Sequence, residues 1–167
     1  MTSTAFPLAP LSTIGILGGG QLGRMLATAA AELGFRTHIY CPEADSPAFD
    51  VAHAQTIAPY DDADAMAAFA GAVDVATYEF ENVPLAAASR LAGLVELRPG
   101  VKALGISQDR LDEKIFLAGI GAPPAPYWPV TTASDLERLP FDADRYVHKT
   151  RRLGYDGKGQ EMVTSRT

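Results

Sequence analysis

The chain has 167 residues, a formal net charge of −6 and an apolar share of 47%, which is enough for one domain or slightly more. The negative balance argues against a general nucleic-acid binder, which must neutralise many phosphates, although one small anionic ligand can still bind in a local basic pocket. A single cysteine, Cys41, excludes an intrachain disulfide, and no apolar run reaches the roughly 20 residues of a membrane span.

These bounds predict a cytoplasmic protein that binds neither membrane nor nucleic acid. The first eleven residues lack the basic start of a signal peptide, so we expect a loose tail there. The three histidines are scattered and show no zinc-like spacing, and no metal site is predicted within the chain.

Residues 12–40 predict a strand, a glycine turn, a helix and a second strand. The apolar run 12–17 is typical of a strand buried on both faces of a parallel sheet. Strong helix formers fill residues 24–33, and residues 35–40 favour a strand. The turn between the first strand and the helix would present unpaired N–H groups of the helix N-terminus to an anion.

The glycines of this turn, Gly18, Gly20 and Gly23, allow three interpretations. Their G-x-G-x-x-G spacing is typical of dinucleotide binding, provided that an acidic residue closes the second strand about 20 residues later. Glu43 comes late for that role and follows Pro42. The glycines can instead serve only a tight turn and close helix packing, or they can place an anionic substrate group at the turn.

The next strand, predicted over residues 73–78, ends in two carboxylates, Glu79 and Glu81. Ligands of open α/β sheets lie beyond the carboxyl ends of the strands, and strand alternation would point both side chains to one side. They could accept hydrogen bonds from a substrate amine or hydroxyl. Alternatively, they are only acids at the N-terminus of the helix that follows Pro84.

Further helices are predicted around this strand. Residues 61–70 begin with carboxylates, as helix starts do, and residues 85–94 predict another helix, followed by a short strand over 95–97. Ser107 is expected to cap a helix over 108–118. Ser134 with Glu137 forms a capping-box pattern for a short helix.

A glycine-rich loop with Gly154, Gly157 and Gly159 follows a predicted strand over 145–150. Glycine lets backbone N–H groups turn toward one point, and such a concave nest of amides suits phosphate oxygens. A strand pattern resumes at Gln160, so this is not the P-loop, which opens into a helix. Four cations lie beside the glycines: Lys149, Arg151, Arg152 and Lys158. The loop therefore predicts a hairpin flap over a nucleotide, or else an ordinary exposed hairpin.

Three stretches together, Gly18–Met25, Tyr78–Asn82 and Lys149–Gln160, resemble the 5-(carboxyamino)imidazole ribonucleotide synthetases, ATP-grasp enzymes of purine biosynthesis. The resemblance spans about residues 13–163. It implies the α/β fold class, with a Rossmann-like pre-ATP-grasp domain and its parallel sheet over residues 12–107. The first, incomplete part of an ATP-grasp domain would follow over residues 108–167.

The resemblance also implies a reaction. ATP phosphorylates bicarbonate to carboxyphosphate, which carboxylates 5-aminoimidazole ribonucleotide and gives 5-(carboxyamino)imidazole ribonucleotide, ADP and phosphate. The nearest competitor is the formate-dependent glycinamide ribonucleotide transformylase. A nicotinamide dehydrogenase and a non-catalytic nucleotide-sensing module are the alternatives outside the ligases.

Site residues follow by the same resemblance, and none is assigned a catalytic role. ATP would be bound by Arg110, Lys149, Gly154, Tyr155, Asp156, Gly157, Lys158, Gly159 and Gln160. The ribonucleotide would lie beside Gly20, Gln21, Leu22, Glu79, Glu81, Tyr155 and Asp156. In the family the Mg²⁺ ligands come from a later part of the chain. We therefore expect the 167-residue piece to be an inactive amino-terminal portion of a homodimeric enzyme.

Overall fold

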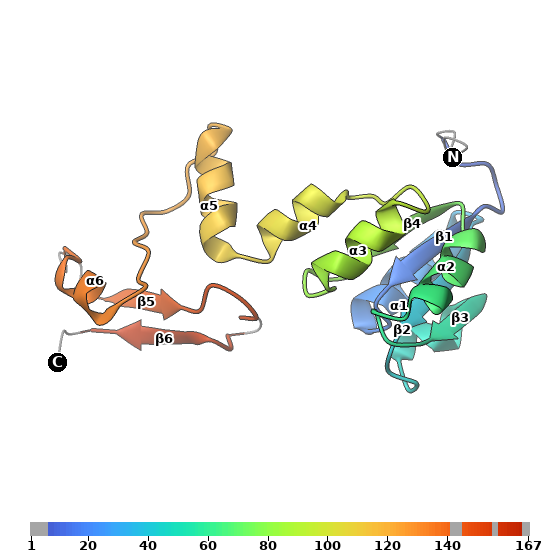
Figure 1. Cartoon of the computed structure of the whole chain (residues 1–167), viewed down its shortest axis with the longest axis horizontal. Helices are drawn as coiled ribbons and strands as arrows, with labels where there is room; N and C mark the ends of the chain where they lie inside the picture. Colours follow the sequence, from blue (N-terminus) through green and yellow to red (C-terminus); the bar gives the residue numbers. More distant parts are fainter. Residues whose placement is uncertain (1–6, 141–144, 155–156, 165–167) are drawn as a thin grey trace. The chain divides into compact units, whose positions relative to one another are not determined.

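The structure is a computed structural model, and it describes residues 7–140, 145–154 and 157–164. The chain divides into two compact units, Met1–Leu104 and Gly105–Thr167, called unit 1 and unit 2 below (Figure 1). The predicted domain boundary after residue 107 stays a prediction.

Unit 1 is built on a parallel sheet with the strand order β3-β2-β1-β4. The strands are β1 (Thr13–Leu17), β2 (Arg36–Cys41), β3 (Ala54–Ile57) and β4 (Val75–Tyr78). Leu17 lies opposite both Tyr40 and Tyr78 in the register, so the carboxyl ends of β2, β1 and β4 meet at one edge. The predicted α/β class with a parallel sheet is thereby confirmed. The predicted strand over 95–97 is reduced to an isolated parallel bridge between Ala76 and Leu97.

Helical segments connect these strands or follow β4. They are α1 (Gln21–Glu32), the 3₁₀ helix η1 (Pro47–Val51), α2 (Ala63–Gly71), α3 (Leu85–Ala92) and α4 (Val101–Ser107). The first of them begins directly after the glycine turn, three residues before the predicted start at residue 24. The sequence patterns gave no indication of α4.

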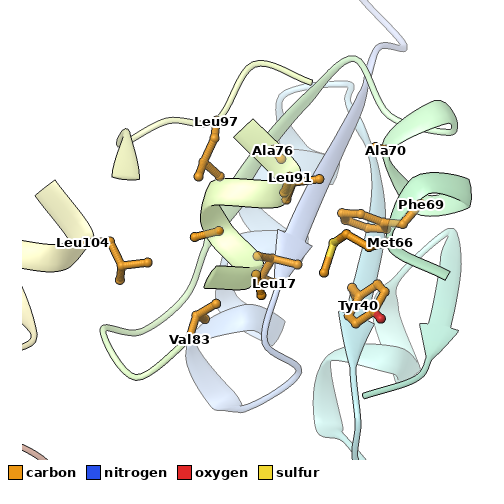
Figure 2. Close-up of a cluster of buried hydrophobic side chains, with 12 residues drawn as sticks. Leu17, Tyr40, Met66, Phe69, Ala70, Ala76, Val83, Leu91, Leu97 and Leu104 are labelled. Atoms are coloured by element: carbon orange, nitrogen blue, oxygen red, sulfur yellow. The ribbon is translucent and has the colours of Figure 1, made fainter. Parts of the chain in front are cut away.

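Apolar residues cover both faces of the sheet, because neighbouring residues of a strand point to opposite sides. Ile16 and Ile39 pack with Ala27 of α1 on one face. Leu17 and Tyr40 belong to the larger cluster on the other face, with side chains from α2 and α3. Figure 2 shows Met66 and Phe69 of α2 beside Tyr40 in this cluster. The sheet edge that carries the glycine turn is thus fixed by a packed core on both sides.

Unit 2 contains two helices and a hairpin. The helices are α5 (Arg110–Gly119) and α6 (Ala133–Glu137), and β5 (Tyr146–Lys149) pairs antiparallel with β6 (Gln160–Val163). Both predicted helix caps are wrong. Ser107 is the last residue of α4, and the side chain of Asp109 caps α5 instead. The capping box of α6 is formed by Thr132 and Asp135, two residues before the predicted pair.

The two units differ in how well they bury apolar side chains. Every buried hydrophobic side chain of the described residues lies at or before Leu104. In unit 2 large apolar side chains stay open to solvent, including Phe116 at 41% and Trp128 at 42% exposure. Among the described residues, no helix has both the length and the apolar character of a membrane span.

Candidate functional site

The turn after β1 lies directly beside the end of β4. The backbone N–H of Glu79 donates to the carbonyl of Leu17 at 3.0 Å, so the sheet itself places Glu79 next to Gly18. Gly20 follows as the N-cap residue of α1 and has no side chain to cap the helix. The first turn of α1 therefore needs acceptors from elsewhere for its free N–H groups.

Glu79 supplies these acceptors. Its Oε1 accepts a hydrogen bond from the N–H of Gly20 at 2.7 Å, and its Oε2 accepts one from the N–H of Gly23. A carboxylate at this position is also favoured by the partial positive charge of a helix N-terminus. Both oxygens of the half-buried Glu79 are thus engaged within the protein.

The glycines of the turn leave space for this carboxylate. A Cβ added to Gly20 would lie 2.9 Å from Glu79 Oε1, and one added to Gly23 would lie 2.9 Å from Glu79 Oε2. Gly18 has φ +105°, which favours glycine. Of the three interpretations of these glycines, the tight turn with close packing fits the geometry. Two of the amides that could bind a pyrophosphate or an anionic substrate group, those of Gly20 and Gly23, are occupied by Glu79.

The other residues predicted to contact the ribonucleotide are less constrained. Gln21 and Leu22 lie exposed in the first turn of α1, and Leu22 is 55% exposed. The chain leaves strand geometry after Tyr78, so strand alternation does not apply to Glu79 and Glu81. That both side chains point to one side stays a prediction. Glu81 is half-buried in the following turn, and Asn82 Nδ2 lies 3.5 Å from its Oε1.

A separate hollow opens near the same edge, beyond β2, β3 and β4. Its volume is about 380 Å³, and it is lined by Pro42, Pro59, Tyr60, Asp61, Pro84, Ala86, Ala87 and Arg90. Its walls are mostly apolar residues, and none of the predicted site residues lines it.

In unit 2 the glycine-rich loop joins β5 and β6, as the sequence predicts. Lys149 lies opposite Gln160 in the hairpin, and Thr150 donates its N–H to the carbonyl of Gly159 at 2.8 Å. Gly157 and Gly159 have φ +80° and +66°, a backbone conformation that favours glycine. Two residues predicted for this site, Tyr155 and Asp156, lie outside the described residues.

The start of α5 holds this loop at two points. The N–H of Arg110 donates to the carbonyl of Arg151 at 2.9 Å, and its guanidinium donates to the carbonyl of Gly154. A Cβ on Gly154 would lie 3.1 Å from Arg110 Nη2, so glycine permits this approach. The structure thus brings together two predicted ATP-binding residues, Arg110 and Gly154. Arg110 is half-buried rather than spread over an exposed face.

Asp109 is the residue of this site that the sequence patterns missed. It is only 6% exposed, its Oδ1 accepts from Arg151 Nε at 2.9 Å, and its Oδ2 lies 2.8 Å from Arg151 Nη2. Arg152 Nε lies 3.8 Å from the same carboxylate. These hydrogen bonds from Arg151 hold the pKa of the Asp109 carboxyl below its ordinary value, despite the opposing effect of burial. An Asp directly before a helical charge pattern was the available signal.

Internal pairing changes the role expected for the four cations beside the glycines. Arg151 and Arg152 have a partner in Asp109, so a phosphate is not needed to balance them. Lys149 is exposed at the end of β5, and within the described part of the chain no ion pair of its ammonium group is recorded. Lys158 is also exposed. The loop therefore offers Lys149 and its backbone amides to an anionic ligand.

A resident metal site is not apparent in the part of the chain that the structure describes. No group of three or more His, Cys, Asp or Glu side chains there could hold a metal ion. The described residues therefore do not fit a Mg²⁺ site by themselves.

Comparison with known proteins gives one family and many relatives. Residues 11–108 match the family described as ribonucleotide synthetase preATP-grasp domain. The chain is 52% identical over 159 residues to the N5-carboxyaminoimidazole ribonucleotide synthase of Brucella melitensis. That alignment covers 95% of this chain and 44% of the relative.

Solved structures agree in fold. The Staphylococcus aureus N5-carboxyaminoimidazole synthetase complexed with ADP is similar with a TM-score of 0.87 and 36% identity, covering 95% of this chain and 43% of that one. The Aspergillus clavatus N5-carboxyaminoimidazole synthase, in complex with ADP and 5-aminoimidazole ribonucleotide, has a TM-score of 0.76 at 26% identity. The structural match covers 92% of this chain and 41% of the Aspergillus clavatus protein. The chain thus spans less than half the length of these proteins.

Proposed function

The chain belongs to the ribonucleotide synthetase preATP-grasp domain family, and on that premise we propose that it works in an ATP-dependent carbon–nitrogen ligase. The proposed reaction is the carboxylation of 5-aminoimidazole ribonucleotide with bicarbonate through carboxyphosphate. Its products are 5-(carboxyamino)imidazole ribonucleotide, ADP and phosphate. Because the relatives are more than twice as long, the activity is proposed for a protein that contains this chain together with the remainder of their length.

The glycine-rich loop of unit 2 is the observation that best supports the proposal. Its Gly154 is held by Arg110, and Lys149 is exposed at its base. Cations and backbone amides aimed at a transferring phosphoryl group are the main source of catalysis in phosphoryl transfer. In the proposed site, Lys149, Lys158 and the amides at Gly157 to Gln160 contact ATP phosphates. Arg110 acts by keeping the loop in place.

In unit 1, Gly20, Gln21, Leu22 and Glu81 are proposed to lie beside the ribonucleotide. Glu81 is the carboxylate proposed to accept hydrogen bonds from the substrate amine, because each oxygen of Glu79 already accepts one backbone hydrogen bond; the second lone pair of each Glu79 oxygen leaves Glu79 as the other candidate. Mg²⁺, which would neutralise phosphate charge when bound, is proposed to use ligands outside the described residues. A homodimer and a cytoplasmic location complete the proposal.

An assay of a protein with the relatives' full length tests this function. ATP with bicarbonate and 5-aminoimidazole ribonucleotide should give ADP and the carboxylated product, whereas formate with glycinamide ribonucleotide should give neither. The 167-residue chain alone should release no ADP, because its described residues hold no metal site. Bicarbonate-dependent ADP release by that piece at the rate of the longer protein would contradict the proposal.

A variant pair locates the site in the longer protein. Lys149→Ala should raise the KM for ATP by roughly tenfold or more, since hydrogen bonds from charged groups are worth about 1.5–3 kcal/mol. Lys102→Ala removes an equally exposed lysine of α4 and should leave the KM unchanged. Equal effects of the two substitutions would argue against a phosphate contact at Lys149.

A further inference from the structure

The strand–glycine–helix segment of unit 1 has the features of an anion site, and an anion already lies in it. Glu79 Oε1 lies 2.7 Å from the N–H nitrogen of Gly20, and Oε2 accepts from Gly23. We infer that the turn from Gly18 to Gly23 is an anion site that the chain fills with its own carboxylate. Glu79 is then a positioning residue for this edge of the sheet.

The sheet delivers this carboxylate to the turn. The backbone of Glu79 is fixed by its hydrogen bond to Leu17 at 3.0 Å, one residue before Gly18. Glu79 therefore acts as a tethered ligand with a high effective concentration, and a free anion must compete with it. A phosphate that entered the turn would also be repelled by the displaced carboxylate.

The space at the turn supports the same conclusion. A Cβ on Gly20 or Gly23 would come within 2.9 Å of the Glu79 carboxylate oxygens, which is closer than real Cβ contacts. The glycine pattern that elsewhere admits a pyrophosphate is thus accounted for by an internal ligand. Nothing larger than the carboxylate is needed to explain the three glycines.

The inference sharpens the proposed function in one respect. Two carboxylates follow β4: each oxygen of Glu79 already accepts one backbone hydrogen bond, whereas the side-chain contact of Glu81 is the 3.5 Å approach of Asn82. The assignment of Glu81 to the substrate amine rests on the proposed function. The self-occupied turn does not, because it follows from contacts within unit 1 alone.

Thermal unfolding in phosphate tests the inference on the 167-residue chain. The unaltered chain, Glu79→Ala and Glu81→Ala are compared in sodium phosphate and in sodium chloride of equal ionic strength. Glu81→Ala is the matched control, because it removes one carboxylate at the same edge without freeing the amides of Gly20 and Gly23. It also reports the general stabilisation that phosphate gives to folded proteins.

Only Glu79→Ala should gain additional stability from phosphate, with a rise in Tm of roughly 3 °C or more at about 50 mM beyond that of Glu81→Ala. Equal gains in all three proteins, or no extra gain in Glu79→Ala, would overturn the inference.

A second measurement decides the case if Glu79→Ala fails to fold. In the unaltered chain, the amide NMR signals of Gly20 and Gly23 should not shift when phosphate is added. Saturable shifts at those two amides would show that the turn is open to anions and would refute self-occupation. Neither measurement contains ATP or ribonucleotide, so a negative ligase assay leaves this result standing, and the reverse also holds.

Discussion

Among single residues, Asp109 links two elements of unit 2 through one carboxylate. Its Oδ1 caps α5 by accepting from Leu111 N–H at 2.9 Å and also accepts from Arg151 Nε at 2.9 Å. Because this group is ionised in both contacts, its protonation state controls how firmly the glycine-rich loop is held to the helix. Arg151 is the main cause of its lowered pKa.

This linkage predicts an acid-sensitive contact. A carboxyl with a lowered folded pKa stabilises the fold above its unfolded pKa, and the contribution is lost as the pH falls through the folded value. The Arg151 Nε–H signal in NMR should therefore persist at neutral pH and disappear only below pH 3.8, the ordinary value of the group. Asp109→Asn keeps a capping side chain and should lose that signal already at pH 7. Glu113→Gln, a neighbouring change in the first turn of α5, should leave it unaltered.

Cys41 gives a second prediction for a single residue. It is the only thiol of the chain, it is 5% exposed, and burial together with a hydrogen bond to Glu43 raises its pKa. Thiolate is the reactive form, so alkylation by iodoacetamide at pH 8 should be at least about tenfold slower in the native chain than in urea. Equal rates in the two conditions would show that β2 opens at Cys41.

Among the elements, α1 carries glycine where helices usually disfavour it. Gly23 lies within its first turn, and an added Cβ would meet Gly18 O at 2.8 Å and Glu79 Oε2 at 2.9 Å. Close approach of the turn and the carboxylate therefore outweighs the roughly 1 kcal/mol by which alanine is favoured over glycine in a helix.

Two alanine substitutions measure this competition. Gly23→Ala should lower the free energy of unfolding of unit 1 by about 1–3 kcal/mol, as overpacking does. Gly71→Ala, at the end of α2 where a Cβ meets nothing within 4 Å, should be neutral or stabilising by up to about 1 kcal/mol. Urea unfolding followed by circular dichroism gives both values. If Gly71→Ala were destabilised as much as Gly23→Ala, close contacts of the added Cβ could not explain the loss of stability at Gly23.

For the whole molecule, the uneven distribution of buried apolar side chains is the main feature. All those of the described residues belong to unit 1, and hydrophobic burial is the dominant favourable contribution to folding. Unit 2 depends on hydrogen bonds and on ion pairs such as Asp109–Arg151, whose arginine is 52% exposed. Exposed ion pairs contribute little stability.

Native-state hydrogen exchange should therefore separate the two units. Amides of β1 and β2 should exchange only through global unfolding, whereas those of β5 and β6 should exchange at least about a hundredfold faster, through local opening. Asp109→Ala, which removes both the cap and the partner of Arg151, should accelerate exchange in α5 without affecting β1. Equal protection of amides in both units would contradict the expectation that unit 1, with its buried apolar side chains, is the more stable unit.

The sequence patterns predicted the sheet of unit 1 well, because apolar runs such as residues 12–17 report directly on burial. They misplaced the caps of α5 and α6, since Ser107 and Asp109 are both capping residue types and only the folded backbone decides between them. The hydrogen bond that Glu79 accepts from the N–H of Gly20 spans 59 residues, and sequence spacing gives no indication of such a pairing. The predicted contacts with ATP and ribonucleotide remain predictions.

The carboxylate at the head of α1 has a consequence for selectivity in a cell. Two of the three proposed substrates, ATP and the ribonucleotide, are phosphorylated, and many other metabolites carry the same group. If the amides of Gly20 and Gly23 were unoccupied, they would attract the phosphate groups of all these metabolites to the turn before α1. Because Glu79 occupies the amides of Gly20 and Gly23, phosphate groups are kept from this turn, which would favour their binding at the loop proposed to contact ATP.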